Sequence, residues 1–486
     1  MDRVHQGISE LCPWCRRQSL QVTVEGARNL IPGVDSAVPL YDGSTSRYVN
    51  LDNAATTPPF RTVLDCLNGF ADWYASVHRG TGFKSLLSTQ AYEHCRQVVA
   101  DFIGADLSYH SVIFVQNATH ALNKLAARMC LPQAGAVVTT LMEHHSNLLP
   151  WRKYGCVVEH ANVRRTDGSL DLGDLRARIA RNAGRLHLVT VSGASNVTGD
   201  VPPIRTIAHM AHEHGALMAV DATQLVPHRP FKMGPPGDPS SIDFVAFSGH
   251  KMYAPFGCGV LVGPRRLFEQ GPPDMVGGGT VHAVTARDTL WAEPPEREEA
   301  GTPNVLGAIA LAAAISTLNS IGMENVADHE RALTRRALRK LLKLDDLTLY
   351  GHRDEELRQD RLGVIGMNAR HLNHGQLAAA LGYEWGIGVR NGCFCAQPYV
   401  RELLGVSESE AQAATSRLAA GDHVTVPGMV RMSVGVYNTP EDVDLFVEAL
   451  QCILVDGPRA RYVLRDPAEG YVPESLPFDF AAYRPF

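Results

Sequence analysis

From residue 48 onward, short apolar runs alternate with amphipathic segments, and this alternation limits the possible folds more than any other feature of the sequence. The runs are almost continuously apolar, which is typical of strands buried on both faces of a parallel sheet. They lie at 111–116, 136–141, 186–192, 216–220, 244–247 and 259–262. Helical candidates lie between them at 91–103, 118–129 and 203–214. The pattern predicts an α/β fold whose large domain holds a mostly parallel central sheet.

A Gly/Pro-rich segment at 300–304 interrupts this pattern, and a long helical stretch at 306–344 follows it. Farther on lie apolar runs at 362–368 and 388–390, a strand near 430–434 and a helix at 440–454. These elements predict a smaller C-terminal α/β domain. We therefore expect an N-terminal extension at 1–47, a large ligand-binding domain at 48–305, a small domain with an interdomain helix at 306–455, and a tail at 456–486.

The composition excludes several classes of partner. The formal net charge is −6, so no basic surface points to nucleic acid or an anionic membrane. No run reaches the ~20 apolar residues of a membrane span, and the N-terminus lacks the apolar core of a secretory signal. Ten cysteines in 486 residues are too sparse for a disulfide scaffold. We expect a cytoplasmic protein that binds a small molecule or another protein.

Lys251 is one of only seven lysines, and it follows the apolar run at 244–247 within the sequence FSGHK. Ligands of parallel α/β sheets bind beyond the carboxyl ends of the strands. Ser248 and His250 flank the lysine as hydrogen-bond donors suited to a phosphate. A solvated lysine in a surface turn is the competing interpretation. On these residues alone, a Schiff-base lysine is the minority hypothesis.

Two further strand ends carry residues suited to the same ligand. Asp221 follows the run at 216–220 and could pair with the protonated pyridine nitrogen of a pyridoxal cofactor, although an N-cap or turn is the commoner role of aspartate there. Ala118 and Thr119 open a helix after the strand at 111–116, where backbone N–H groups and a hydroxyl could bind phosphate. His144 follows the run at 136–141 and could stack on a flat ring. A metal site at the adjacent histidines is the weaker alternative, because neighbouring positions do not face one site.

Nine separated motifs, in order, give the chain a resemblance to a known family. They are LDNAATTP (51–58), SVHRG (76–80), MEHHSNLLPW (142–151), SNVTG (195–199), VDATQ (220–224), FSGHK (247–251), EAGTPN (299–304), VRNGCFCAQP (389–398) and VRMSVGVYNT (430–439). The chain resembles class V pyridoxal-phosphate enzymes, in the branch of cysteine desulfurases and selenocysteine lyases. The resemblance covers about four-fifths of the chain and implies fold type I of the pyridoxal-phosphate-dependent transferases.

The resemblance also implies residue roles. Lys251 would form the Schiff base with pyridoxal phosphate and move the Cα proton, while His144 would stack on the pyridine ring and assist proton transfer. Asp221 would hold the ring nitrogen and Gln224 the phenolic oxygen. The phosphate would be bound by Ala118, Thr119, Ser248, His250 and, across a homodimer interface, Thr302.

The amino-acid substrate would be held by Asn196 and Arg431, because an arginine fits an α-carboxylate with two hydrogen bonds. The same entrance would be lined by His78, Arg79 and Arg390. No metal ligand is implied.

Cys395 occupies the position where desulfurases of this branch carry the nucleophile. Its thiolate would attack the substrate sulfur and leave an enzyme persulfide and alanine, whereas a buried structural cysteine is the competing interpretation. The preceding sequence departs from the usual histidine-rich pattern. It reads GCFC and looks more like the version in molybdenum-cofactor sulfurases, so Cys393 could accept sulfur or form a redox pair. The segment 401–428 is longer than usual and could cover the site or dock a sulfur acceptor.

The leading hypothesis is thus a pyridoxal-phosphate cysteine desulfurase that passes sulfur from L-cysteine through Cys395 to an acceptor protein. The alternative keeps the cofactor without a persulfide step, as in a C–S or C–Se lyase, epimerase or aminotransferase of a specialised pathway. A non-catalytic sulfur-relay or scaffold protein is a third hypothesis, and the intact set of Lys251, Asp221 and His144 argues against it. Cys12 and Cys15 form a single CxxC, and no second CxxC supplies the two further ligands that a zinc site needs. Two reduced structural thiols are the favoured interpretation, and a redox pair or a metal shared across a dimer is the weaker alternative.

Overall fold

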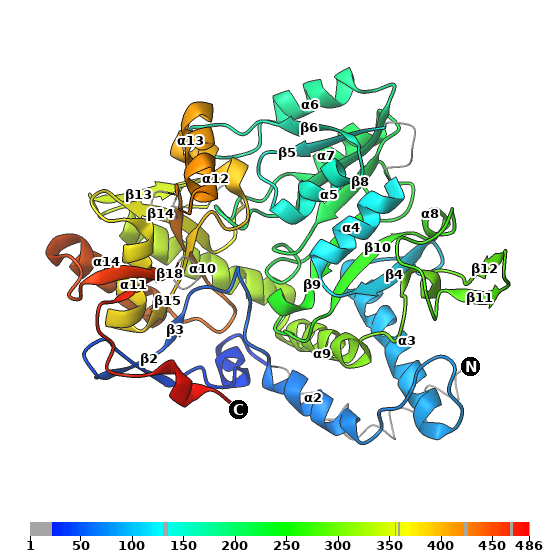
Figure 1. Ribbon diagram of the computed structural model, residues 1–486, viewed down its shortest axis with the longest axis horizontal. Coiled ribbons are helices and arrows are strands. Elements are labelled where there is room, and N and C mark those ends of the chain that lie inside the picture. Colours follow the sequence, from blue (N-terminus) through cyan, green and yellow to red (C-terminus); the bar gives the residue numbers. More distant parts are fainter. Residues whose placement is uncertain are drawn as a thin grey trace.

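A seven-stranded sheet forms the centre of the larger part of the molecule (Figure 1). We describe it from a computed structural model that defines residues 22–129, 135–354, 356–357, 360–421, 426–466 and 470–485. The strand order is β4-β10-β9-β8-β7-β5-β6. The strands are β4 (His110–Val115), β5 (Ala136–Thr140), β6 (Val157–Ala161), β7 (Leu186–Ser192), β8 (Leu217–Asp221), β9 (Phe244–Ser248) and β10 (Gly259–Pro264).

All pairings from β6 across to β9 are parallel, and only β10 runs antiparallel to its neighbours. The mostly parallel sheet predicted from the sequence is therefore confirmed, and each of the six apolar runs forms a strand. The edge strand β6 was not predicted. Its sequence VVEHA is half polar, and all but its last residue are incompletely buried, so it lacks the continuous apolar pattern of the inner strands.

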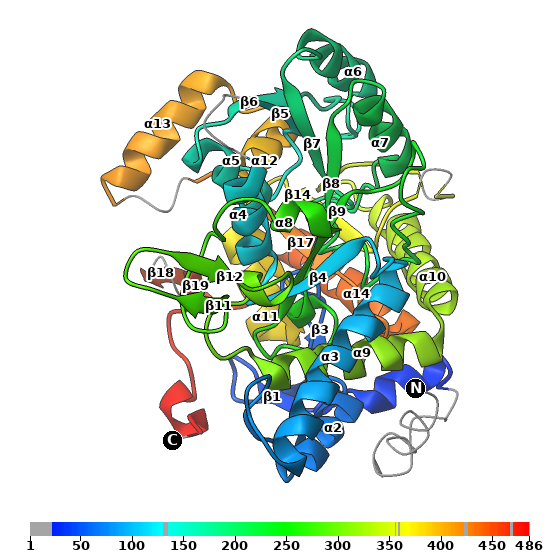
Figure 2. The same ribbon diagram turned by 90° about the vertical axis from the view of Figure 1, so that its right-hand side faces the viewer.

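Helices cover both faces of this sheet (Figure 2). Successive strand residues enter different apolar clusters, as Val112 packs in one and Ile113 in the other. This burial on two faces explains why the strands lack polar alternation. The surrounding helices are α2 (Arg61–Ala71), α3 (Phe83–Ile103), α4 (Ala118–Met129), α5 (Leu149–Lys153), α6 (Leu172–Arg181), α7 (Ile204–His212), α8 (Arg265–Phe268) and α9 (Val305–Ile321). A hairpin of β11 (Val281–Val284) and β12 (Thr289–Trp291) projects from this part (Figure 2).

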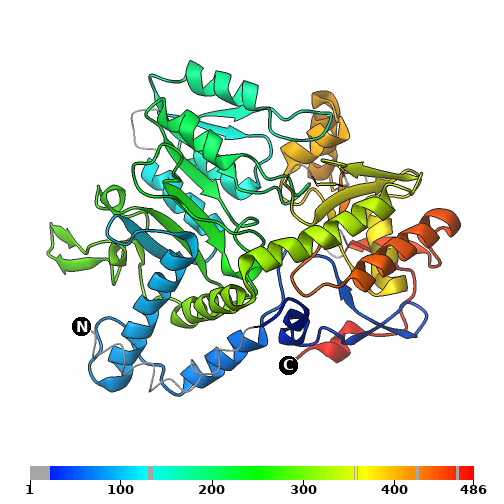
Figure 3. The ribbon, with the colours of Figure 1, turned by 180° about the vertical axis from the view of Figure 1, so that it is seen from behind.

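The stretch at 306–344 was predicted as one long helix, and that prediction is wrong. It forms α9 and α10 (Met323–Leu341), which are bent by 75° across Gly322 (Figure 3). Gly322 has φ of +89°, a conformation that glycine adopts without steric cost.

Across the described residues, no single helix has the length and apolar composition of a membrane span. The bent pair α9–α10 meets those two criteria only when both helices are taken together.

The second part is built on a four-stranded antiparallel sheet of order β13-β14-β17-β16 with its own apolar core. Its strands are β13 (Leu347–Tyr350), β14 (Val364–Ala369), β16 (Arg390–Gly392) and β17 (Met429–Ser433). Helices α10, α11 (His374–Trp385) and α14 (Pro440–Asp456) pack with it. The three boundaries between the four segments set from the sequence stay predictions.

The described part of the N-terminal extension is ordered against the second part. It contains η2 (Glu25–Leu30) and the hairpin of β1 (Ala37–Pro39) and β2 (Thr45–Arg47). Directly after it, β3 (Val49–Asn50) pairs with β15 (Ile387–Gly388) of the second part. Arg47 forms a 2.7 Å ion pair with buried Asp442 of α14.

Cys12 and Cys15 lie outside the described residues. Cys156 is disulfide-bonded.

The chain ends in a second hairpin and a short helix. These elements are β18 (Tyr462–Asp466), β19 (Gly470–Pro473) and η6 (Phe480–Tyr483). Glu384 of α11 accepts hydrogen bonds from the Arg459 and Ala460 backbones and from the Tyr462 hydroxyl. One buried carboxylate thus ties the start of the tail to the small domain.

The long segment that follows Cys395 folds into two helices, α12 (Gln397–Leu404) and α13 (Glu408–Ala419). A capping box between Ser407 and Glu410 fixes the start of α13. Arg165, from the loop between β6 and α6, pairs with Glu402 of α12 at 3.2 Å. Helix α13 extends from this side of the molecule (Figure 2).

Candidate active site

Lys251 lies at the carboxyl edge of the large sheet, where β9 continues into the single turn η4 (Gly249–Lys251). The residue is buried, which excludes the solvated surface lysine. Burial and the positive charge of Arg431 lower the pKa of its amine to about 8. Near neutral pH the neutral, nucleophilic form of this amine is therefore far more populated than that of a lysine in water.

Asp221 ends the neighbouring strand β8, and its register partner on β9 is Ala246. Its side chain accepts hydrogen bonds from the Thr223 backbone N–H at 3.1 Å and hydroxyl at 2.5 Å. Asp221 therefore does hold a turn, as the competing interpretation expected. The carboxyl is also fully buried, burial raises its pKa, and it interacts electrostatically with Lys251. Both residues face one edge of the sheet.

The start of α4 meets the end of β9 at the same edge. The Ala118 backbone N–H donates to Ser248 Oγ at 2.8 Å, and the Thr119 hydroxyl lies 2.7 Å from the Ser146 hydroxyl. Gly259 on β10 permits this approach, because a Cβ there would lie 2.5 Å from Asn117 Cα. The predicted phosphate-binding residues of α4 and β9 are therefore brought together.

His144 immediately precedes the turn η3 (His145–Asn147) after β5. Its Nδ1 accepts a hydrogen bond from the Ser146 backbone N–H at 3.1 Å, so the ring proton of the neutral form is on Nε2. Burial and the charge of Lys251 lower its pKa to about 3. His144 is thus a neutral imidazole beside Lys251, suited to stacking on a ring and to moving a proton at Nε2.

A buried carboxylate supports the loop that carries His144. Glu143 accepts hydrogen bonds from Thr140 Oγ1 at 2.6 Å, Asn147 Nδ2 at 2.6 Å and Ser192 Oγ at 2.8 Å. These donors come from the ends of β5 and β7 and from η3. Glu143 therefore holds the ends of two strands and this turn together, a role that the sequence motif did not indicate.

Arg431 and Asn196, the predicted carboxylate ligands, contact each other. Arg431 on β17 donates to the Asn196 carbonyl at 2.9 Å and to Asp52 Oδ1 at 2.8 Å. Asp52 was within a recognised motif but was given no role. Its partner Arg431 is 379 residues away in the sequence, and no local sequence pattern indicates a pairing over such a separation. The site thus has an acidic neighbour that the sequence analysis missed.

The segment with Cys395 lies against these residues. The Cys395 carbonyl accepts a hydrogen bond from the His145 backbone N–H at 2.6 Å, and Asn196 Nδ2 donates to the Phe394 carbonyl at 2.8 Å. Cys395 is exposed, which excludes a buried structural cysteine, and it interacts electrostatically with Lys251. Cys393 is half-buried and its thiol donates to the Pro427 carbonyl at 3.1 Å; burial raises the pKa of this thiol.

The residues present fit pyridoxal phosphate. Gln224 is buried, donates from Nε2 to the Ala54 carbonyl at 2.7 Å, and has a side-chain oxygen without a partner in the described structure. Burial lowers the pKa of His250 to about 4, so its ring is neutral. A buried amine, a buried carboxyl and the start of a twelve-residue helix match the aldehyde, ring nitrogen and phosphate of this cofactor.

Four further residues were predicted for this site. His78 pairs with Glu93 at 3.2 Å, and Arg79 donates to the Val281 carbonyl of β11 at 3.0 Å. Arg390 is exposed and lies 4.0 Å from Asp52, whereas Thr302 is exposed on the loop before α9. The substrate roles of the first three and the phosphate role of Thr302 stay predictions.

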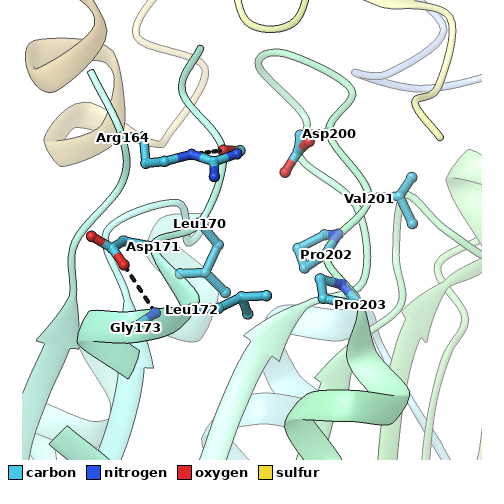
Figure 4. A pocket seen from close by; sticks show the side chains of 10 residues that line it. Arg164, Leu170, Asp171, Leu172, Gly173, Asp200, Val201, Pro202 and Pro203 are labelled. Atoms are coloured by element: carbon cyan, nitrogen blue, oxygen red, sulfur yellow. Dashed lines mark hydrogen bonds between the residues drawn. The ribbon is translucent and has the colours of Figure 1, made fainter. Parts of the chain in front are cut away.

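A cavity of about 350 Å³ lies away from Lys251, beside the start of α6 (Figure 4). Arg164 and Asp171 lie on one side of it and Asp200 and Pro202 on the other (Figure 4). None of the predicted site residues lines this cavity. It is therefore separate from the site described above.

Comparison with protein families gives a match to the model described as Aminotransferase class-V, over residues 49–446. A cysteine desulfurase of Haloferax volcanii is 34% identical over 449 residues, which cover 89% of this chain and 97% of the relative. A cysteine desulfurase of Yersinia pseudotuberculosis is 36% identical over 414 residues, covering 83% and 93%.

Solved structures give a similar result. The apo structure of a cysteine desulfurase from Thermococcus onnurineus has a TM-score of 0.73 and 32% identity, covering 84% of this chain and 94% of that one. A cysteine desulfurase of Escherichia coli in an S-sulfonic acid form has a TM-score of 0.71 and 29% identity, covering 88% and 97%. The similarity thus extends over both sheets.

Proposed function

Because this chain is an enzyme of the aminotransferase class V family, with the fold of type I pyridoxal-phosphate enzymes, we propose that it converts L-cysteine to L-alanine and collects the sulfur as a persulfide on Cys395. The observation that carries the proposal is the exposed Cys395 segment lying against Asn196 and the loop of His144, within electrostatic reach of Lys251. The family resemblance drawn from the nine motifs is confirmed.

Pyridoxal phosphate would be held by residues at the carboxyl edge of the large sheet. Lys251 would bind its aldehyde, Asp221 its ring nitrogen, and the start of α4 its phosphate, with His144 against the ring. Gln224 would contact the phenolic oxygen, and the side chains of Ser248 and His250 would complete the phosphate site. When bound, the cofactor supplies an electron sink for negative charge that develops at the substrate Cα.

The protein residues orient the substrate and move its protons. Arg431 and Asn196 would bind the α-carboxylate and so fix Cα relative to Lys251. With a pKa near 8, Lys251 Nζ can hold the Cα proton and return it. His144 carries its proton on Nε2, where it can exchange with the reacting atoms.

Sulfur transfer needs one nucleophile and no external oxidant. Cys395 Sγ, as thiolate, attacks the substrate sulfur; an S–S bond forms and the substrate Cβ–S bond breaks. The electron pair of the broken bond remains on the carbon fragment, which takes up protons and leaves as alanine. The persulfide sulfur then passes to a thiolate of an acceptor protein.

The absorbance spectrum of the purified protein, before and after addition of L-cysteine, tests the proposal together with assays of alanine and sulfide. We expect a visible band that shifts with cysteine, alanine as product, and loss of both alanine and persulfide in Cys395→Ala. The same band without alanine, or full turnover in Cys395→Ala, would instead favour a lyase, epimerase or aminotransferase without a persulfide step. The length of the segment 401–428 is the feature that keeps this alternative open. Absence of the band would favour a non-catalytic sulfur-relay protein.

We also propose a homodimer in which Thr302, exposed before α9, binds the phosphate of the partner site, and a cytoplasmic location. Helix α13, which follows α12 in the segment after Cys395 and extends outward from the molecule (Figure 2), is the proposed docking site of the acceptor. Sedimentation of the wild-type protein and of a Thr302→Ala variant, with cofactor affinity measured for both, tests the shared site. A monomer with unimpaired cofactor binding would contradict it.

A further inference from the structure

Phe394 contacts both of the side chains assigned to the substrate carboxylate. Its ring stacks on the Arg431 guanidinium, with Arg431 Cζ 4.8 Å from the ring centroid. Its carbonyl accepts the hydrogen bond from Asn196 Nδ2 at 2.8 Å. The phenylalanine is itself buried, so this cation–π contact is shielded from water. Phe394, which lies between the two cysteines of the GCFC sequence, therefore covers one side of the site assigned to the substrate carboxylate.

The Arg431 guanidinium is closed to solvent in this arrangement. Arg431 is only 2% exposed, and its terminal nitrogens donate to Asn196 and Asp52. Its Nε is buried and has no hydrogen-bond partner among the described residues. An incoming carboxylate would satisfy such an N–H group, but it can reach the guanidinium only after a neighbouring residue has moved.

Of the two residues that cover Arg431, Phe394 and Asp52, Phe394 is the one that can move more easily. Phe394 and Cys395 both have positive φ, at 53° and 54°, a left-handed conformation that is unfavourable for residues with a Cβ atom. Tertiary contacts hold this conformation, among them the Asn196 hydrogen bond. Asp52, the other residue that covers Arg431, is fixed in the backbone through its bridge to Ser433. Loss of the Asn196 and Arg431 contacts therefore removes support from a strained segment, while Asp52 stays in place.

We propose that Phe394 is a substrate-operated latch. In the ligand-free protein it covers Arg431 and engages Asn196, and an amino-acid α-carboxylate displaces it from both. This displacement frees the segment that carries Cys395, so that the thiol becomes mobile only when an amino acid is bound. The inference rests on the proposed function, because it assigns the α-carboxylate to Arg431 and Asn196.

A latch has an energetic signature opposite to that of a structural support. Phe394 and the carboxylate compete for Arg431. A substitution that weakens the contact of Phe394 with Arg431 therefore raises the affinity for the ligand, by the same factor by which that contact had lowered it. If Phe394 merely shaped the site, its removal would weaken binding. The sign of the change in affinity therefore separates the two roles.

The experiment measures binding of L-alanine by calorimetry in wild type, Phe394→Leu and Phe394→Tyr. Leucine keeps an apolar side chain but removes the ring face, whereas tyrosine keeps it. We expect L-alanine to bind Phe394→Leu roughly 3- to 30-fold more tightly than wild type, and Phe394→Tyr to match wild type. L-Alaninamide, which lacks the carboxylate, should not distinguish the variants. Phe480→Leu, on the exposed tail, is the matched control and should behave as wild type.

Hydrogen exchange of the backbone supplies a second measurement on the wild-type protein. We expect L-alanine to speed the exchange of amides at 394–397 while L-alaninamide does not, whereas ligand binding without a latch would slow them. Equal or weaker binding of L-alanine to Phe394→Leu overturns the latch. If that variant does not fold, the wild-type exchange decides, and unchanged or slower exchange overturns it. The proposed function fails separately, when L-cysteine yields no alanine, because neither measurement requires turnover.

Discussion

Replacing Lys251 with methionine should stabilise the cofactor-free protein. The side chain is buried, and burial together with Arg431 lowers the pKa of its amine from 10.5 to about 8. At about 1.4 kcal/mol per pH unit, this shift means that the charged amine costs the folded state about 3 kcal/mol. Methionine has a similar volume and no charge. At about pH 7 we expect Lys251→Met to unfold with a free energy about 3 kcal/mol higher than wild type.

The sign of the pH dependence follows from the same shift. The unfolded chain keeps the Lys251 proton up to its ordinary pKa of 10.5, whereas the folded chain releases it above about 8. Between these values the unfolded state binds more protons, so the free energy of unfolding of wild type rises with pH. The advantage of Lys251→Met is therefore complete below about pH 8 and decays to zero toward about pH 10.5.

Denaturant unfolding of the cofactor-stripped proteins at several pH values measures both effects. Lys124→Met is the matched control, because Lys124 is also buried but pairs with Glu298 at 3.1 Å and with Asp274. Removing one partner of a buried ion pair destabilises by about 3–5 kcal/mol, so the two lysine variants should change stability in opposite directions. A Lys251→Met protein no more stable than wild type, or one whose advantage does not depend on pH, would refute the reasoning.

Three further substitutions test the framework of the site. Asp52→Asn removes an acid whose pKa burial raises and leaves Arg431 donating to a neutral side chain, so we expect denaturant unfolding to change by less than about 1 kcal/mol; a loss of about 3 kcal/mol would show instead that the ionised pair stabilises the fold. Gly259→Ala pushes a methyl group against the Asn117 backbone, so we expect about 2 kcal/mol lower stability and weaker pyridoxal-phosphate binding in a fluorescence titration. Intact binding would show that the start of α4 tolerates the shift. Glu143→Gln places a donor amide among three donors, and thermal unfolding should show a loss of about 2 kcal/mol; equal stability would mean that the network adapts.

The inner strands and the ends at which Lys251 and Asp221 lie could be predicted because both depend on local sequence. A strand buried on two faces is continuously apolar, and a polar residue at its end marks the edge where ligands bind. The long helical stretch at 306–344 was wrongly predicted as one helix because residues that favour helix continue through it, and only Gly322 marks the bend.

The pairings of Asp52 and Phe394 could not be predicted in this way. Asp52 meets Arg431 only because residue 52 forms a bridge to Ser433 at the end of β17, a contact between distant segments. Phe394 covers Arg431 because β16 pairs with β17 and delivers the following turn onto it. Both contacts arise from the register of the small sheet, which hydrophobic periodicity does not specify at the level of single residues.

The charges of the site explain why anionic ligands suit it. Lys251 and Arg431 are buried cations close enough that Arg431 lowers the pKa of Lys251, and burial raises the pKa of the two nearby acids, Asp52 and Asp221. Both acids are thus less readily ionised than in water, so the cations are incompletely compensated. A cofactor phosphate and a substrate carboxylate would each add negative charge to this water-poor region, where charge interactions are strong. The ligand-free site is therefore electrostatically strained, and binding of the ligands relieves that strain.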